Sequence, residues 1–325
     1  MALNNGTQNK FAKRLNRQPV LRWLFWLVVI GILILLGWLF NDYQGGFYEV
    51  PVADNVNIGV DWLVINLDVF FDGIKIATAT VLNGLERFLL WLPWWVVLIF
   101  IVLVAWRLSG ILVATFSGAA MYIIGTLGLW DLCMSTLALV ATAVLISVAL
   151  GVPIGILSAR SDRVDNIVRP VLDVMQTMPA FVYLIPALMF FGIGKVPGVI
   201  ATVIFALPPA VRLTNLGIRL VPKDLVEAAQ TFGSTQSQLL FKVQLPLAMP
   251  SIMAGINQTI MLSLSMVVLA AMIASGGLGR EVIMALGQVD IGRGFVAGVS
   301  IVLVAMILDR VTQSLAKKKR EVKAL

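Results

Sequence analysis

The sequence contains no histidine, one cysteine and few charged residues. Without histidine, imidazole metal ligands and histidine acid–base catalysis are excluded, and Cys133 alone cannot form an internal disulfide framework. Only 13% of the 325 residues are charged, whereas 59% are hydrophobic. Because soluble domains carry roughly 25% charged residues, this composition excludes an ordinary water-soluble fold and indicates a membrane protein.

A phosphate-binding loop is also missing from the sequence. Such a loop needs the pattern G-x-x-x-x-G-K-[ST], and the Gly-Lys pair of this chain, Gly194-Lys195, is followed by Val196. We therefore expect that the chain is not an enzyme and has no catalytic residues, no metal site and no cofactor of its own.

The basic balance of the chain does not indicate a nucleic-acid partner. The net charge is +7, but the lysines and arginines are dispersed and no DNA- or RNA-binding motif is present. In a membrane protein, such residues mark the cytoplasmic loops.

Apolar runs of about 20 residues recur along almost the whole chain, and each can cross a hydrocarbon core of roughly 30 Å as a helix. The sequence thus predicts an all-α polytopic membrane protein embedded in a lipid bilayer. We expect about eight transmembrane helices, at residues 20–40, 88–107, 109–130, 132–158, 172–193, 197–216, 249–274 and 294–312.

The distribution of charge between these runs predicts their orientation. Basic residues gather in residues 1–19, in the loops that follow 132–158 and 197–216, and in the tail 313–325. By the positive-inside rule, both termini lie in the cytoplasm (N-in, C-in). The apolar core of the first run is too long for a signal peptide, so we expect a retained helix in a multi-pass protein of the cell inner membrane.

Residues 41–87 differ from the spans because they contain seven acidic residues and only two basic ones. An acidic segment with few positive charges belongs outside the cell membrane. Within it, Trp62, Val69 and Phe70 are among the apolar residues that recur at roughly helical spacing. Two interpretations stay open: an amphipathic helix at the membrane interface, or an ordinary covered loop.

Proline and glycine predict helices that bend and pack closely. Prolines kink membrane helices, and they lie within or near the spans at Pro153, Pro179, Pro186, Pro208 and Pro209. Glycines four residues apart allow two helix backbones to approach closely, and such pairs occur at Gly151 and Gly155 and at Gly194 and Gly198.

The stretch from Arg219 to Met249 is too polar to span a membrane, yet it is patterned. Asp224 and Glu227 are spaced as a capping pair, in which the aspartate accepts backbone N–H groups and the glutamate reaches back. The pattern predicts a short helix over Leu225–Phe232, ended by Gly233 in a left-handed conformation.

A second helix is expected to begin at Ser234 and to rejoin the membrane near Leu245–Pro246, so that residues 217–248 form a cytoplasmic helix–turn–helix. Ala228 and Ala229 offer little bulk, so the first helix can enter a narrow groove on another protein. Apolar anchors are available at Leu225, Val226 and Phe232. A docking lever and a simple connection without a partner both fit these features.

This loop resembles the EAA loop of ABC importer permeases. The match comprises Glu227-Ala228-Ala229, Gly233 after three residues, Val243 after nine more, and Leu245-Pro246 after one; valine replaces the commoner isoleucine at 243. In that family, the loop is a coupling helix seated in the ATP-binding subunit. The resemblance implies docking, and not catalysis, for Glu227, Ala228, Ala229, Gly233, Val243, Leu245 and Pro246.

A second resemblance extends over roughly residues 130–315. Segments at 172–186, 191–200, 205–214 and 244–259 and the Gly-Gly-Leu-Gly run at 276–279 are similar to glycine betaine/proline betaine permeases of the ProU type. It implies the transmembrane domain of a type I ABC importer for these or related quaternary-ammonium solutes, used in osmoprotection. Choline and carnitine are the alternative solutes.

Hydropathy and charge, together with the loop resemblance, predict a division of the chain, and the resemblance implies a set of partners. The chain divides into a cytoplasmic N-terminus (1–19), a first transmembrane helix (20–40) and an external acidic segment with a candidate interfacial helix (41–87). Two further transmembrane helices (88–130), a permease core with its coupling loop (131–312, loop 217–248) and a basic cytoplasmic tail (313–325) follow. The expected partners are two copies of an ABC ATP-binding subunit, which holds ATP and Mg, a second copy of this permease, and a periplasmic or tethered solute-binding protein.

Two other classes, an ion-coupled secondary transporter and a channel or scaffold, are weighed against this one. Secondary transporters usually place ionisable residues inside spans, whereas residues 132–158 and 249–274 contain none. A channel or scaffold leaves the coupling loop unexplained. Several polar and aromatic residues could line a solute pathway: Gln176, Thr177, Phe181, Tyr183 and Asn257. The alternative for these residues is hydrogen bonding between helices or contact with lipid.

Overall fold

The computed structural model describes residues 17–39 and 52–321, and every element in these two ranges is helical. The chain divides into two compact units, Met1–Val60 and Asp61–Leu325. The first unit contains the apolar helix α2 (Arg17–Leu39), so a helix lies where the first span is predicted, and its role as a transmembrane helix stays a prediction. The greater part of the predicted cytoplasmic N-terminus, the start of the external segment and the end of the basic tail lie outside the described residues.

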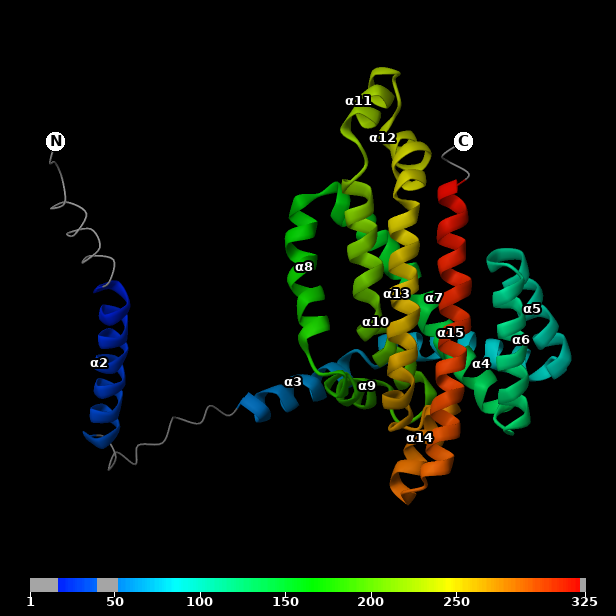
Figure 1. Cartoon of the computed structure of the whole chain (residues 1–325), viewed down its shortest axis with the longest axis horizontal. Coiled ribbons are helices and arrows are strands. Elements are labelled where there is room, and N and C mark those ends of the chain that lie inside the picture. The colour runs from blue at the N-terminus through cyan, green and yellow to red at the C-terminus, as the bar shows by residue number, and fades with distance from the viewer. Residues whose placement is uncertain (1–16, 40–51, 322–325) are drawn as a thin grey trace, which may run out of the picture. The chain divides into compact units, whose positions relative to one another are not determined.

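The second unit is a helical bundle (Figure 1). Helix α3 (Val52–Asn66) leads into it. Its elements are α4 (Asp68–Trp91), α5 (Trp94–Ser109), α6 (Ile111–Thr126), α7 (Trp130–Arg160), α8 (Asp162–Thr177), the 3-10 turn η1 (Ala180–Tyr183), α9 (Leu184–Phe191), α10 (Lys195–Arg219), α11 (Lys223–Thr231), α12 (Gln236–Gln238), the π-helix η2 (Leu239–Gln244), α13 (Leu245–Ala271), α14 (Gly277–Gln288) and α15 (Ile291–Glu321).

Helix α10 forms the centre of the bundle because it packs along both α7 and α13. Glycines make this packing possible: a Cβ atom added to Gly155 on α7 would lie 2.6 Å from the Cβ of Thr214. On α13, a Cβ added to Gly255 would lie 2.9 Å from the carbonyl oxygen of Pro209. Close approach of two helix backbones requires such small residues, so the expected role of Gly155 is confirmed.

The predicted spans 88–107 and 172–193 are each broken at a proline into two helices, which form either one bent span or a re-entrant loop. The break at Pro93 separates α4 from α5 with a bend of 104°, and that at Pro179 separates α8 from the following turn and α9 with a bend of 109°. Leu92 and Met178, which precede these prolines, are extended, with ψ of 133° and 139°. A proline ring clashes with a helical residue before it, which is why both helices end there.

Four helices of the described residues are long and apolar enough to cross a membrane, or up to six if each bent pair counts as one span. These four contain the predicted spans at 132–158, 197–216 and 294–312 and most of that at 249–274. The expected total of eight spans and the N-in, C-in orientation stay predictions.

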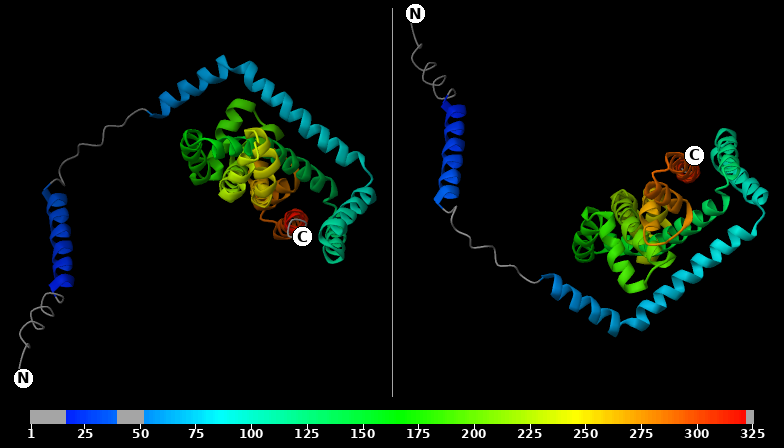
Figure 2. Two further views of the ribbon diagram at one scale, coloured as in Figure 1. Left: turned by 90° about the horizontal axis from the view of Figure 1, so that it is seen from above. Right: turned by 90° about the horizontal axis from the view of Figure 1, so that it is seen from below.

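The described part of the predicted external segment is helical, so an ordinary loop is excluded for residues 52–66 and 68–91. Helix α4 runs along one side of the bundle instead of parallel to its long helices (Figure 2). It is fastened by Glu86, which accepts a hydrogen bond from Ser135 at 2.6 Å and pairs with Lys195 at 2.6 Å. A stacked pair, Phe71 and Phe190, adds an aromatic contact at 4.4 Å between ring centroids.

Replacing Glu86 with glutamine is expected to lower the thermal midpoint of the detergent-solubilised protein. The carboxylate is buried and holds both Lys195 and Ser135, so the loss is about 1–2 kcal/mol after allowance for the half-exposed lysine. Asp72→Asn is the matched control, because Asp72 is exposed on the same helix. Equal midpoints for the Glu86→Gln and Asp72→Asn variants would contradict a fastening role for Glu86.

Candidate functional site

The predicted coupling loop projects beyond one end of the bundle as α11 and α12, and α14 lies at the opposite end (Figure 1). The first helix begins at Lys223, two residues earlier than predicted, and its N-cap is Pro222 without a side-chain hydrogen bond. The predicted capping pair of Asp224 and Glu227 is therefore wrong. Because Lys223 is already helical, Asp224 lies inside the first turn, where its negative charge still favours the helix N-terminus.

The end of α11 forms as predicted. Gly233 adopts a φ of +78°, and its N–H donates to the carbonyl oxygen of Gln230 at 2.9 Å. The N–H of Ser234 donates to the carbonyl oxygen of Ala229 at 3.1 Å. These two bonds constitute a Schellman motif, which turns the chain sharply and needs a left-handed residue at the glycine position.

The second helix begins later than predicted. Thr235, and not Ser234, is its N-cap, and Thr235 and Gln238 form a reciprocal capping box. The spacing of threonine and glutamine is visible in the sequence as Thr-Gln-Ser-Gln, so the signal could have been found. The π-helix then returns to the bundle, where Leu240 packs against Ile218 and Ile252. The loop is thus anchored at its base to the helices on both sides.

The residues assigned to docking divide between the tip and the base of the loop. Glu227, Ala228 and Gly233 are exposed on or next to α11, and Ala229 is half-buried. Near them Phe232 is 90% exposed, so its ring is available for contact with another protein. The half-buried residues at the base are Val243, Leu245 and Pro246.

A hollow of about 330 Å³ lies beneath α11, and Glu227 and Gln230 are among the residues that line it. In the described part of the chain, no side chain pairs with the carboxylate of Glu227. An exposed acidic residue beside apolar side chains, on a helix fixed at both ends, is suited to docking another protein.

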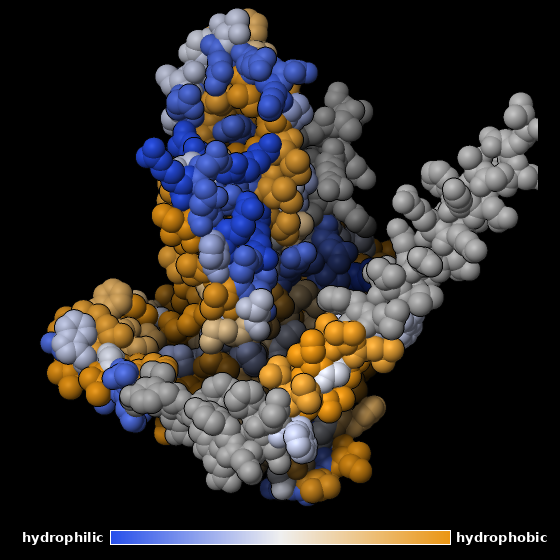
Figure 3. Space-filling model, turned by 90° about the vertical axis from the view of Figure 1, so that its left-hand side faces the viewer, coloured by the Kyte–Doolittle hydropathy of each residue, from blue (hydrophilic) through white to orange (hydrophobic). Residues whose placement is uncertain are grey.

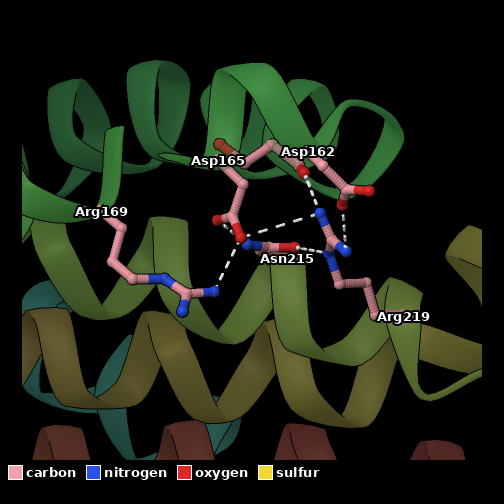
Figure 4. A network of polar contacts seen from close by, with 6 residues as sticks. Asp162, Asp165, Arg169, Asn215 and Arg219 are labelled. Carbon is pink, nitrogen blue, oxygen red and sulfur yellow. Dashed lines mark hydrogen bonds and ion pairs between the residues drawn. The ribbon is translucent and has the colours of Figure 1, made fainter. Parts of the chain in front are cut away.

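A network of charged residues joins α8 to α10 next to this loop (Figure 4). The Arg219 guanidinium contacts Asp162 at 2.7 Å and donates to Asn215 at 2.8 Å. Asn215 in turn donates to the buried Asp165 at 2.7 Å, and Arg169 also pairs with Asp165, at 2.7 Å. A backbone carbonyl at the end of α7 accepts a further bond from Arg219. The ends of α7, α8 and α10 that lie next to the loop are therefore held together.

The charged residues continue along the same two helices, away from the loop. Asp173 on α8 pairs with Arg212 on α10 at 2.5 Å. Together with the network, they form what we call the polar stripe: Asp162, Asp165, Arg169, Asp173, Arg212, Asn215 and Arg219. Most of it borders a hollow of about 330 Å³. Viewed from the α8 side, hydrophilic surface descends from the loop between hydrophobic flanks (Figure 3).

The structure does not bring all of the predicted pathway residues together. Gln176 and Thr177 are exposed at the end of α8, and Phe181 is exposed on the next turn. Tyr183 is buried, and its hydroxyl donates to a backbone carbonyl of α8 at 2.7 Å. Asn257 lies between α13 and α15, where it donates to Asp309 at 3.1 Å and accepts a bond from Thr312.

Tyr183 and Asn257 therefore have packing partners that account for their polar atoms, which favours the alternative of hydrogen bonding between elements. The polar stripe was missed as a group because its ion pairs join residues that are 39 and 57 positions apart. Within the described residues, no group of three or more Cys, Asp or Glu side chains converges as a metal site does.

Comparison with known proteins places this geometry in a family. Residues 151–321, which include the polar stripe and the whole loop, match the binding-protein-dependent transport system inner membrane component family. The chain belongs to this family. The permease is a multi-pass membrane protein with the type I ABC importer fold, and its family members are transport components and not enzymes.

Several relatives of the permease are similar along most of its length. It is 51% identical over 271 residues to the glycine betaine/proline betaine transport system permease protein ProW of Escherichia coli K12, covering 83% of this chain and 77% of the relative. It is also 51% identical to the glycine betaine transport system permease protein OpuAB of Bacillus subtilis, covering 84% of this chain and 96% of the relative.

A solved structure shows the same fold. The inward-facing MetNI methionine ABC transporter has a TM-score of 0.53 at 18% sequence identity, covering 57% of this permease and 92% of that chain. The membership in an ABC transport family implies ATP-binding subunits and a substrate-binding protein as partners.

Proposed function

We propose that this permease carries glycine betaine, proline betaine or a related quaternary-ammonium solute inward, in a reaction driven by ATP. The observation that carries the proposal is the identity of 51% with relatives named for glycine betaine, over more than four-fifths of the chain. Carnitine is the alternative solute, since a glycine betaine/carnitine permease of Listeria monocytogenes, GbuB, is 48% identical over 281 residues.

The ATP and Mg belong to the partner in this proposal. The sequence has no phosphate-binding loop, so two copies of an ATP-binding subunit hydrolyse ATP beneath the coupling loop. A solute-binding protein, free in the periplasm or tethered, delivers the solute to the permease in the cell inner membrane.

The docking residues act as a lever. The exposed tip with Glu227, Ala228 and Phe232 seats in the ATP-binding subunit, and the Schellman turn at Gly233 sets the angle between α11 and α12. Because α11 follows α10 and the π-helix leads into α13, a rigid-body movement of the ATPase is passed to the two helices that pack most extensively in the bundle.

A second copy of the permease completes the pathway. Charged side chains are expensive in contact with lipid, and the polar stripe is flanked by hydrophobic surface (Figure 3). The polar stripe must therefore face water or protein. A second permease related by a two-fold axis would cover the stripe and enclose a water-filled pathway beside it. Asp173 and Arg212, which are partly exposed in the isolated chain, then face the interior of the dimer.

Uptake in proteoliposomes tests the proposal. Vesicles that contain the permease, its ATP-binding subunit and its solute-binding protein are expected to accumulate radiolabelled glycine betaine. Accumulation should require ATP on the side of the membrane where the ATP-binding subunit lies. The matched control carries an ATP-binding subunit with its catalytic glutamate replaced. Uptake driven by an ion gradient without ATP would overturn the transport class, and uptake of an unrelated solute alone would overturn the substrate.

A further inference from the structure

The ion pair of Asp173 and Arg212 differs from the rest of the polar stripe in its exposure and its partners. The side chains are 58% and 40% exposed. In the described part of the chain, Arg212 contacts Asp173 alone, so most of its five N–H donors are free. Arg219 is instead held by two side chains and a backbone carbonyl. The side chains of Asp173 and Arg212 can therefore separate without breaking a hydrogen bond of any other residue.

The depth of this pair excludes lipid as its environment. Arg212 lies seven residues before the end of α10, which is about 10 Å along a helix, and α10 is long and apolar enough to cross a membrane. Ionisable residues inside membrane helices face a cavity or another protein, and they mark the paths of solutes and ions. The hollow beside the pair, about 330 Å³ in volume, is lined by polar side chains of both helices.

The charge of the polar stripe indicates what kind of solute it suits. It contains three carboxylates and three guanidinium groups, so its net charge is zero while both signs are presented. A solute with one net charge would be attracted by half of these groups and repelled by the other half. A zwitterion satisfies both signs at once, because its carboxylate can bind a guanidinium fork while its cationic end faces a carboxylate.

We propose that Asp173 and Arg212 are the point in the pathway where a zwitterionic solute is recognised. The carboxylate of the solute replaces Asp173 on the Arg212 guanidinium, and the quaternary ammonium faces the released Asp173 carboxylate. Gln176 and Thr177, exposed one turn further along α8, offer polar contacts on the outward side. This inference rests on the proposed function, because it names the residues that select zwitterions from that class of solutes.

The first test uses the wild-type complex of permease and ATP-binding subunits in nanodiscs, without ATP and without the solute-binding protein, which would itself bind the solute. Saturation-transfer NMR detects weak contact of methyl protons with the complex. Three solutes of similar shape are compared: glycine betaine, choline, and 3,3-dimethylbutanoate, which keeps the carboxylate but replaces nitrogen with carbon. Saturation transfer is expected for glycine betaine alone. Equal transfer to any of the other two would overturn the proposal.

The second test compares Arg212→Gln with a matched variant of the same helix pair. Arg212→Gln is expected to weaken the glycine betaine signal about tenfold, as loss of a charge-assisted hydrogen bond predicts, and Arg212→Lys to retain part of it. Arg163→Gln removes an arginine that is exposed on α8 and lies outside the polar stripe, and it is expected to leave the signal unchanged.

The outcomes separate this inference from the proposed function. An undiminished signal in Arg212→Gln, or an equal loss in Arg163→Gln, overturns the recognition role while ATP-driven uptake of glycine betaine by the wild type stays intact. If the wild-type complex imports no glycine betaine, the proposed function itself fails. Should Arg212→Gln not assemble, the comparison of the three solutes on the wild-type complex still decides the inference.

Discussion

ATP-driven uptake is expected to fall at least about tenfold when Glu227 is replaced by arginine, because a loss of about 1.4 kcal/mol in docking free energy is enough for that change. Glu227 is exposed at the tip of the coupling loop beside apolar side chains. Reversing its charge leaves the bundle untouched but opposes docking of the ATP-binding subunit. The measurements are uptake in proteoliposomes and co-purification of the ATP-binding subunit with the permease.

Gly233→Val is expected to uncouple transport through a different cause. The φ of +78° at this position costs an L-residue roughly 1–2 kcal/mol, and more for a β-branched side chain. The Schellman turn would then relax and change the angle between α11 and α12. Membrane insertion of this variant should be normal, because a Cβ added at Gly233 meets nothing within 4 Å.

Ser237→Ala is the matched control for both loop variants, since Ser237 is exposed on α12 and lies outside the docking residues. It should transport at the wild-type rate. Normal ATP-driven uptake by Glu227→Arg and Gly233→Val together would refute the docking assignment, whereas loss of uptake in Ser237→Ala would show that any change in the loop is harmful.

The largest effect on stability is expected for Gly155→Val. A Cβ at this position would lie 2.6 Å from the Cβ of Thr214 and 2.7 Å from the carbonyl oxygen of Val211, so α7 and α10 must separate. Overpacking of a core costs typically 1–3 kcal/mol, and the obstacle here includes backbone, which cannot swing aside. We expect little monodisperse protein after extraction into detergent, as measured by size-exclusion chromatography.

Gly298→Val serves as the control for this effect. Gly298 is also in the interior of a long helix, α15, but a Cβ added to it meets nothing within 4 Å. It imposes a similar change of helix propensity without a clash. A wild-type yield for Gly155→Val, or equal losses for the two variants, would contradict the close packing of α7 against α10.

Features of the fold that depend on neighbouring residues were predictable. The apolar runs predicted the long helices α7, α10, α13 and α15, and Gly233 predicted the end of α11, because chain hydropathy and a left-handed glycine act over a few residues. The helix start was wrong by two residues because the helix begins directly after the extended Pro222, with φ of −53° and ψ of 130°, and without a side-chain cap.

Features that depend on distant residues were not predictable. Nothing local in residues 68–91 shows that α4 runs along the side of the bundle, since this follows from the ion pair of Glu86 with Lys195, 109 positions away. The bends at Pro93 and Pro179 had a local signal, but a proline inside an apolar run is also compatible with a kinked, continuous span. Tertiary packing decided between these outcomes.

The sequence by itself determined that this chain is a helical membrane protein with a patterned polar loop and without the phosphate-binding motif, because hydropathy, motif spacing and glycine conformation are properties of short segments. Only the tertiary structure decided that Asp173 and Arg212 meet, because the six charges of the polar stripe, spread over α8 and α10, resemble ordinary helix surface until the two helices lie side by side. Their pairing at 2.5 Å joins separate polar residues into one stripe, and the cost of charged side chains in lipid is the reason for our proposal that the stripe faces a solute pathway.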